Sequence, residues 1–481
     1  MAAAVNKKGE NAVPTVLSML NQLRHRGTDA HGVATPNSTN TANSIEQLTI
    51  RNMNSSVAIG HDLSCILPED HPQPVLGENF ALAFEGRLFP PSDVPDVDVI
   101  LEILRSDPQK NASSIIEKIE GSYAFAIAYQ HKIITGRDLM GTTPLYYGEN
   151  EACFAIASER KALWTIGIRD TKSFPPGYLA FISNRDISFK PVKTIKQPPL
   201  KPTDMKTAAK HLQTLLLEST KSRLSGIKKT VVAFSGGLDS SLIAVLAKSC
   251  GVEVQLITVG LEEQRELHYA KVAAEALELP LHIQIYTQDD VEQALPKVLW
   301  LIEEADVMKV GVAIPIFWAA EIASKLGFRI LLAGQGADEL FGGYQRYLKD
   351  YAAGVEAVRG CIYHDITTCY EKNFQRDNQA CAFHKVELRL PFVDKEVVNF
   401  SLSLPMNLKI ESLKDHLRKR VLRRTAQNLG IPQFIVNRTK KAVQYATGVD
   451  KALRRLARRE GLTLREYVKR AFRKVYSERE T

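Results

Sequence analysis

The sequence predicts two domains: an α+β domain, followed by an α/β domain with a parallel sheet and C-terminal helices. Three observations support this prediction. The chain has 481 residues, more than one hydrophobic core usually serves. The first 190 residues or so contain short apolar runs separated by turn residues, as short strands do. From residue 230 onwards strand patterns alternate with helical patterns, which is typical of a parallel sheet covered on both faces.

We place the first domain at residues 1–192 and the second at residues 205–460. Residues 193–204, rich in Pro and Lys, form the predicted linker, and residues 461–481 form a basic helical tail. Such a linker is a plausible domain boundary because few contacts cross it.

Composition indicates an ordinary soluble protein, with 44% hydrophobic and 24% charged residues. We find no segment long and apolar enough to span a bilayer and no signal peptide, so we expect a cytoplasmic protein without a membrane partner. The six cysteines lack metal-binding spacing, and we expect them to be reduced and buried.

Positive charge is concentrated at the C-terminal end. Residues 414–481 contain 20 Lys and Arg against 6 Asp and Glu, a net charge of +14 in a chain of net charge +8. Such a block could bind nucleic acid. No aromatic residues are interleaved as in RNA-binding motifs, so we favour a solvated helical face and do not expect a nucleic-acid partner.

A phosphate-binding loop follows the strand expected at residues 230–234. Two glycines permit a sharp turn whose backbone N–H groups point at an anion, and the start of the next helix adds partial positive charge. Asp239 would repel a polyphosphate unless a metal lay between them, and its oxygen atoms suit Mg²⁺. The alternative is a simple Gly/Ser turn. The residues expected to bind phosphate here are Ser235, Gly236, Gly237, Leu238, Asp239 and Ser240.

The pattern that follows predicts strands at residues 253–259, 281–286 and 328–333 and helices at 240–249, 266–277, 290–303 and 314–326. The last of these strands runs into a second loop, with Gly334, Gly336, Asp338 and Glu339. Because parallel strands end at one edge of a sheet, Asp338 can reach the same metal as Asp239.

Together the two loops, Ser-Gly-Gly-Leu-Asp-Ser-Ser and Gly-Gln-Gly-Ala-Asp-Glu-Leu-Phe-Gly-Gly-Tyr, resemble those of the glutamine-dependent asparagine synthetases and their β-lactam-synthetase relatives. The resemblance implies a pyrophosphate-loop ATP pyrophosphatase domain of Rossmann-like fold. By position, Asp239 and Asp338 would hold Mg²⁺ and Glu339 would lie beside an acyl-adenylate. Val259, Gly334 and Gly336 would contact ATP.

Two later segments extend the resemblance. Residues 386–394 are similar to the family's Glu-x-Arg-x-Pro-Phe-Leu-Asp segment, whose ion pairs we interpret as structural. Residues 438–448 are similar to its catalytic Arg-x-Lys loop, which implies catalytic roles for Arg438 and Lys440. A lysine there would offset charge on the α-phosphate and the departing pyrophosphate. Lys441 is the alternative, and solubility alone would also explain two adjacent lysines.

Short matches between residues 60 and 177 occur in the order found in the class II glutamine amidotransferase domain of that family. This resemblance implies an αββα sandwich of the N-terminal nucleophile hydrolase type, with Gly86 and Asp96 as remnants of a glutamine site. The family's N-terminal Cys nucleophile is missing, because the chain begins Met-Ala-Ala-Ala-Val. A Cys-Gly-Ile lying upstream of Met1 is an open alternative.

Three internal positions also depart from the amidotransferase pattern. Asp62 stands where the family has an Arg for the glutamine carboxylate, Glu85 replaces the oxyanion-hole Asn, and Arg87 replaces a Glu. A carboxylate opposes both the substrate carboxylate and a developing oxyanion. We therefore expect the first domain to be impaired in glutamine hydrolysis.

Taken together, the resemblance implies an ATP- and Mg²⁺-dependent ligase that converts aspartate to asparagine through β-aspartyl-AMP, releasing AMP and pyrophosphate. Ammonia, or less readily glutamine, would supply the nitrogen, and a homodimer is an open possibility. Three alternatives remain: the same adenylation of another carboxylic acid, an adenylating protein linked to tRNA or another nucleic acid, and a degenerate scaffold.

Overall fold

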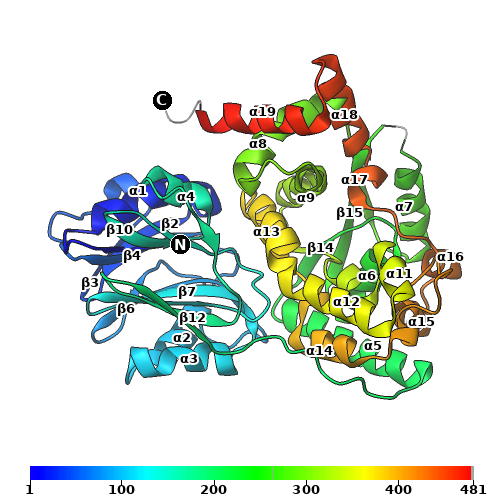
Figure 1. Cartoon of the computed structure of the whole chain (residues 1–481), viewed down its shortest axis with the longest axis horizontal. Helices are drawn as coiled ribbons and strands as arrows, with labels where there is room; N and C mark the ends of the chain where they lie inside the picture. Colours follow the sequence, from blue (N-terminus) through cyan, green and yellow to red (C-terminus); the bar gives the residue numbers. More distant parts are fainter. Residues whose placement is uncertain (263, 478–481) are drawn as a thin grey trace. The chain divides into compact units, whose positions relative to one another are not determined.

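The computed structural model describes residues 1–262 and 264–477. By its internal contacts the chain divides into two compact units, Met1–Ile195 and Lys196–Thr481. Each has its own sheets and helices (Figure 1).

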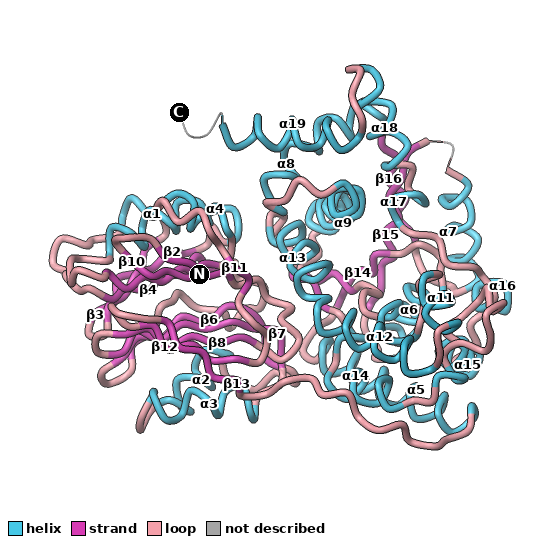
Figure 2. Tube along the Cα trace, viewed as in Figure 1, coloured by secondary structure: helices cyan, strands magenta, loops and turns pink. Residues whose placement is uncertain are grey.

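Unit 1 contains two antiparallel sheets (Figure 2). The first has the strand order β11-β9-β10-β1-β4-β2-β3 and the second the order β13-β12-β8-β7-β6-β5. The strands are β1 (Ala2–Asn6), β2 (Ala30–Thr35), β3 (Ser38–Ala42), β4 (Val57–Leu63), β5 (Val75–Leu76), β6 (Phe80–Leu88), β7 (Gly121–Tyr129), β8 (Lys132–Arg137), β9 (Tyr146–Glu149), β10 (Cys153–Ala157), β11 (Lys172–Ser173), β12 (Tyr178–Ile182) and β13 (Ile187–Pro191).

Alternating side chains build the layers of unit 1. Along β1, Ala2 and Ala4 face a core that includes helices α1 (Val13–Leu23) and α4 (Arg160–Thr165), whereas Ala3 and Val5 face the core between the sheets. The second sheet likewise buries its outer face against α2 (Asp96–Leu104) and α3 (Pro108–Lys118). Period-two alternation is what a strand buried on both sides requires. The result is the predicted αββα sandwich.

Unit 2 is built on one parallel sheet with the strand order β16-β15-β14-β17-β18. Its strands are β14 (Lys229–Ala233), β15 (Glu253–Leu261), β16 (Leu281–Tyr286), β17 (Ile330–Leu332) and β18 (Glu387–Arg389). After β14 the chain adds β15 and β16 on one side of it, and then crosses over to add β17 and β18 on the other side. Ligands bind at such a switch point, outside the carboxyl ends of the strands.

Helices cover this sheet and form the remainder of unit 2. They are α5 (Met205–Leu224), α6 (Leu238–Ser249), α7 (Arg265–Ala276), α8 (Gln288–Ile302), α9 (Val307–Lys325), α10 (Ala337–Phe341), α11 (Arg346–Ala352), α12 (Val355–Cys369), α13 (Gln375–Ala382), α14 (Lys395–Ser403), α15 (Arg420–Asn428), α16 (Gln433–Val436), α17 (Val443–Ala446), α18 (Val449–Arg459) and α19 (Leu464–Ser477).

The predicted strands and helices between residues 230 and 333 are all present, with ends shifted by a few residues. The largest shift is at α9, which begins at Val307 rather than at residue 314 because the Asp306 side chain caps it, accepting a hydrogen bond from the Lys309 backbone at 2.8 Å. Strand β18 is an addition, since residues 386–394 were interpreted only as an ion-pair segment. The class of both domains is confirmed.

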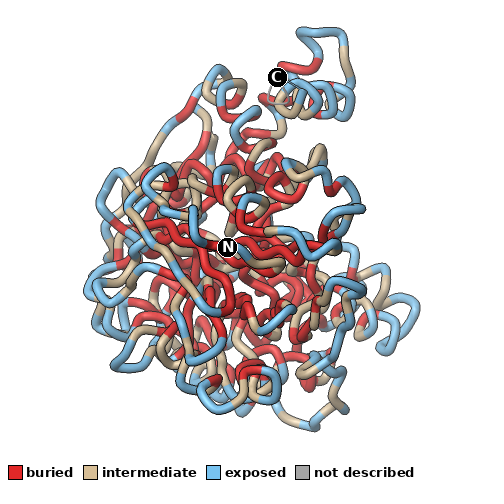
Figure 3. The backbone as a smooth tube through the Cα atoms, turned by 90° about the vertical axis from the view of Figure 1, so that its left-hand side faces the viewer, coloured by how far each residue is buried: buried red, intermediate tan, exposed pale blue. Residues whose placement is uncertain are grey.

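Two expectations drawn from composition need correction. Helix α9 is long and apolar enough to cross a membrane, which sequence inspection missed, but 67% of its most apolar window is buried, as in the core helix of a soluble protein. The burial colours of Figure 3 show how much of the backbone of both units is enclosed. All six cysteines are free thiols, yet Cys65 is exposed and Cys250 and Cys361 are only half-buried.

Candidate functional site

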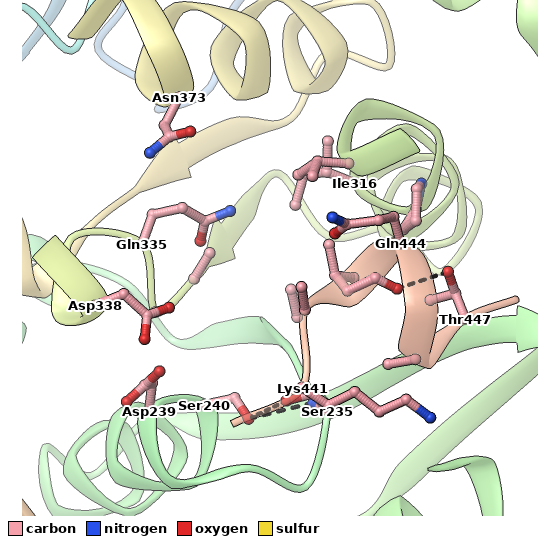
Figure 4. Close-up of a pocket in the computed structure, with 18 of the residues that line it drawn as sticks. Ser235, Asp239, Ser240, Ile316, Gln335, Asp338, Asn373, Lys441, Gln444 and Thr447 are labelled. Carbon is pink, nitrogen blue, oxygen red and sulfur yellow. Dashed lines mark hydrogen bonds between the residues drawn. The ribbon is translucent and has the colours of Figure 1, made fainter. Parts of the chain in front are cut away.

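A cavity of about 730 Å³ lies in unit 2 where β14, β15 and β17 end. Figure 4 shows a close-up of this cavity. Nine of the predicted site residues line it: Ser235, Asp239, Ser240, Val259, Gly334, Gly336, Asp338, Glu339 and Lys440. Loops far apart in sequence are therefore joined in one site by the topology of the sheet.

The first loop turns sharply between β14 and α6. Gly236 has a φ of +67°, in the left-handed region that other residues avoid. Ser240 Oγ lies 3.2 Å from both the backbone nitrogen and the Oγ of Ser235, and these contacts fix the turn. Gly236, Gly237 and Leu238 shape this turn but are not among the described residues that line the cavity. The loop thus places Ser235, Asp239 and Ser240 at the cavity wall.

Arg438, predicted to be catalytic, supports the same loop from outside the described lining. Its Nη1 donates a hydrogen bond to the Ser235 carbonyl at 2.9 Å, and its guanidinium lies 3.6 Å from the centroid of the Tyr269 ring. Stacking on an aromatic ring holds a guanidinium in one orientation. In this structure Arg438 therefore positions the first loop.

Asp239 and Asp338 converge across the cavity, with side chains that point toward one another (Figure 4). Lys419 lies between them: its Nζ is 2.7 and 2.8 Å from the two Asp239 oxygens and 2.6 Å from Asp338 Oδ1. Lys440 contacts the other oxygen of Asp338. Two carboxylates and two ammonium groups thus form a cluster without net charge.

The two aspartates suit a magnesium ion bound together with a phosphate. Mg²⁺ prefers oxygen ligands and is usually held by one or two carboxylates, the rest of its shell being water and phosphate. Oδ1 of Asp338 is buried and accepts no well-directed hydrogen bond from the described residues, although Lys419 is close. Within the described part of the chain no group of three or more His, Cys, Asp or Glu could hold a metal. Two carboxylates match the part of a magnesium ion's ligand shell that a protein usually supplies.

Close backbone approach is essential at Gly343, just after α10. A Cβ atom there would lie 2.0 Å from Asp338 Oδ1 and 2.3 Å from Lys419 Cε, far inside van der Waals contact. Any side chain at this position would disrupt the cluster. Gly343 in the second loop is thus required for the placement of Asp338 and Lys419.

Charges within the cluster shift its pKa values. Burial alone would raise the pKa of Asp338, but Lys419 and Lys440 outweigh it and hold that pKa well below its usual range. Burial would lower the pKa of Lys440, yet Asp338 and Asp239 raise it above the ordinary value. Both groups stay charged at neutral pH, so the ion pair between Asp338 and Lys440 persists there.

Glu339 is buried beside this cluster. Its Oε1 accepts hydrogen bonds from the Tyr344 hydroxyl at 2.5 Å and from Asn373 Nδ2 at 2.8 Å. Burial, and then the neighbouring charge of Asp338, raise the pKa of Glu339. Asn373 lies in a π-helical turn, Tyr370–Phe374, and such turns are frequent at functional sites.

Sequence reasoning missed the roles of Lys419 and Asn373. In the structure Arg418 and Lys419 both have left-handed backbones, with φ of 51° and 52°, which costs roughly 1–2 kcal/mol for each non-glycine residue. Arg418 Nε donates to the Gly343 carbonyl at 3.1 Å and so ties this strained pair to the second loop. No local sequence signal predicts such a conformation.

In unit 1, the residues predicted as glutamine-site remnants lie on β6 and at the start of α2. Gly86 has a φ of +123°, and a Cβ there would lie 2.0 Å from the Ser122 carbonyl oxygen. Asp96 Oδ2 accepts a hydrogen bond from the Leu88 backbone at 3.2 Å and lies 3.6 Å from Arg87. Arg87 also pairs with both oxygens of Asp70, at 2.6 and 2.7 Å.

The two carboxylates that depart from the amidotransferase pattern are engaged by other groups of the chain. Glu85 lies 2.6 Å from Arg26 and 3.0 Å from the Met1 amino group, and it accepts a hydrogen bond from Ser158. Burial would raise the pKa of Glu85, but these cations hold it below its ordinary value. Asp62 lies 2.6 Å from His31 Nδ1. Substrate groups would have to displace these contacts.

Comparisons with known proteins agree with this architecture. The family model described as asparagine synthase matches residues 211–356 and 349–479, and one described as a glutamine amidotransferase domain matches residues 61–165. "Putative asparagine synthetase (glutamine-hydrolyzing) 1" of Methanocaldococcus jannaschii is 31% identical over 96% of each chain. An asparagine synthetase of Sandersonia aurantiaca is 27% identical, over 90% of this chain and 83% of its own.

Among solved structures, a glutamine phosphoribosylpyrophosphate amidotransferase from B. subtilis aligns with a TM-score of 0.37 at 16% identity. The alignment covers 59% of this chain and 80% of that one. A similarity this low adds nothing to the sequence relationships.

Proposed function

We propose that this chain, which belongs to the asparagine synthase family, converts aspartate to asparagine through a β-aspartyl-AMP intermediate with ammonia as the nitrogen donor. It is a carbon–nitrogen ligase that uses ATP. A carboxylate does not react with an amine until one of its oxygens becomes part of a good leaving group, and adenylation with loss of pyrophosphate supplies that group. The convergence of Asp239 and Asp338 at the switch point of the sheet is the observation that carries the proposal.

The cavity offers separate surfaces to the two parts of ATP. Its apolar wall suits a flat base and is formed by Val259, Leu267, Val312, Pro315, Ile316 and Val443. The first loop lies at the start of α6, where a helix N-terminus and free backbone N–H groups favour phosphate. We assign the pyrophosphate to this loop and the base to the apolar wall.

The charged cluster would act on the phosphates. Asp239 and Asp338 would hold Mg²⁺, which when bound would offset the negative charge of the leaving pyrophosphate. Lys440 would face the α-phosphate, where a fixed positive charge stabilises the developing negative charge. Glu339, held by Tyr344 and Asn373, would lie next to the acyl group and orient the attacking amine.

Ammonia is the proposed donor because the internal residues of unit 1 oppose glutamine hydrolysis. Glu85 carries a negative charge where an oxyanion would need a hydrogen-bond donor. Asp62 offers no positive charge to a glutamine carboxylate, and Arg87 is already paired with Asp70. Each of these features lies within unit 1.

The test is a product assay with Mg²⁺, ATP and aspartate, supplied with either ammonium chloride or glutamine. Asparagine, AMP and pyrophosphate should form in equal amounts with ammonia, and glutamine should be at least about tenfold less effective. Robust glutamine-dependent turnover would contradict the assignment of the donor. Pyrophosphate release with another acid but not with aspartate would contradict the assignment of the substrate.

A further inference from the structure

Lys419 occupies the position between Asp239 and Asp338 where a divalent cation would bind. Its Nζ is within 2.8 Å of three carboxylate oxygens from two different loops, and its side chain is only 4% exposed. One ammonium group shared by two carboxylates provides the bridging charge that a metal would otherwise supply. Lys440, by contrast, contacts Asp338 alone among the two aspartates.

The backbone that carries Lys419 is strained and braced. Residues in left-handed conformations without glycine persist only where their surroundings fix them, and they concentrate at functional sites. Here Asp415 Oδ1 accepts a hydrogen bond from the Arg418 backbone at 2.7 Å, and Arg423 Nε donates to the Arg418 carbonyl at 2.7 Å. The hydrogen bonds with Asp415 and Arg423 hold the backbone in this conformation despite its free-energy cost. We infer that the conformation serves to place the Lys419 side chain between the two aspartates.

We propose that Lys419 is an internal counter-ion that holds the two aspartates together in the nucleotide-free enzyme, excludes free divalent cations, and moves onto the phosphates when a metal–nucleotide complex binds. The inference rests on the proposed function for the identity of that complex. Since the cluster of two aspartates and two lysines is neutral, a free divalent cation would enter beside two positive charges. A polyphosphate brings the negative charge that makes such entry favourable.

The first experiment measures Mn²⁺ binding, by electron paramagnetic resonance, to the full chain without nucleotide. Wild-type protein should bind Mn²⁺ weakly at this site, and Lys419→Met should bind it at least about tenfold more tightly because one of the two positive charges of the cluster is removed. Lys441→Met is the matched control. It removes the same charge from a lysine in the wall of the neighbouring cavity, but Lys441 pairs with Glu266 at 2.6 Å, so Mn²⁺ affinity should be unchanged.

The second experiment measures the affinity for the Mg²⁺ complex of α,β-methylene-ATP, which cannot be cleaved at the reacting bond. Lys419→Met should weaken this binding by about tenfold or more while it strengthens Mn²⁺ binding, and opposite changes are not expected of a purely structural residue. Lys419→Arg retains the charge and should keep free Mn²⁺ binding weak, which provides a test if the Met variant fails to fold.

Either of two results would overturn the inference: tight Mn²⁺ binding by the wild-type chain without nucleotide, or equal Mn²⁺ affinity in wild type and a folded Lys419→Met variant. Neither measurement depends on the acid substrate or on amide formation. Suppose the chain makes no asparagine, but Lys419→Met binds Mn²⁺ more tightly and the Mg²⁺ complex of α,β-methylene-ATP more weakly. The inference about Lys419 would then stand, and the proposed function would be wrong.

Discussion

At the scale of single residues, the site depends on a few carboxylates and on the absence of side chains near them. Asp239 lies in a neutral cluster, and Asp239→Asn would leave Lys419 without its bidentate partner. We expect Asp239→Asn to reduce the rate of Mg²⁺-dependent pyrophosphate release by about 100-fold or more. Losses of this size are usual when a group that stabilises charge in the transition state is removed. Unchanged release in a folded variant would contradict the metal assignment.

Gly343→Ala tests the close approach behind the same cluster. The new methyl group would collide with Asp338 and Lys419, so we expect a loss of about 1–3 kcal/mol of stability and of most pyrophosphate release. Gly360→Ala is the control. A Cβ at Gly360 meets nothing within 4 Å in helix α12, and this variant should match or exceed wild-type stability by up to about 1 kcal/mol. Thermal melting and a pyrophosphate assay measure both effects.

Local chemistry predicted the residues of the two glycine-rich loops but not their partners. Asp239 and Asp338 follow strands and stand beside glycines, and this pattern is visible in the chain itself. Lys419 and Asn373 reach the cavity through a strained backbone and a π-helical turn. Both features are imposed by tertiary packing, so no sequence window containing them predicts their role.

At the scale of elements, the junction of α9 and α13 contains a half-buried histidine. His384 packs 4.4 Å from the Phe317 ring and 5.1 Å from the Phe383 ring, and its Nε2 has no hydrogen-bond partner among the described residues. Burial lowers the pKa of His384 to about 4, with Glu321, Lys325 and Lys297 as the nearby charges. Protonation therefore favours the unfolded chain.

This lowered pKa predicts acid sensitivity. The folded pKa lies below the ordinary value of 6.5, so the contribution of neutral His384 is present above pH 6.5 and is lost as pH falls toward 4. At pH 5 the loss is about 2 kcal/mol. We expect the melting temperature of His384→Met to change less between pH 7.5 and pH 5 than that of the wild-type protein. The exposed His364→Met should behave as wild type, and an equal pH response in all three proteins would refute the prediction.

Periodicity predicted most elements of unit 2 because strands and helices there are long enough to show a period. Strand β18 has only three residues, too few for alternation to be recognised. The early start of α9 depends on the Asp306 cap, and Pro315 lies inside the helix rather than at its start. The position of a short strand or of a helix end depends on contacts with other parts of the fold, and the local sequence pattern does not show these contacts.

At the scale of the whole molecule, charge is distributed very unevenly. Residues 449–477, which form α18 and α19, hold ten Lys and Arg against three Asp and Glu, a net charge of +7 in a chain of +8. Seven of their apolar or aromatic side chains are buried: Val449, Ala452, Leu453, Leu456, Ala457, Tyr467 and Val468. The basic side chains lie on the opposite faces, and this supports a folded, solvated surface rather than a free tail.

Such a surface should bind RNA only through screened charge. We expect retention of the chain on an RNA column at 50 mM salt and its loss by about 200 mM salt, without preference for sequence. Replacing Arg455, Arg458 and Lys469 by Gln should weaken retention at low salt while leaving amide formation unchanged. Binding that survives 200 mM salt would instead favour a nucleic-acid function. The cytoplasmic location and the homodimer stay predictions.

The pairing of β14 with β17 joins Val231 to Leu331, and the two metal-binding candidates are 99 positions apart in the chain. Closing a loop of that length is entropically costly and makes folding slow in proteins dominated by distant contacts. A chain emerging from the ribosome therefore acquires β14, β15 and β16 well before it can bind nucleotide. Recovery of ATP binding during refolding should accordingly lag behind recovery of helical circular dichroism.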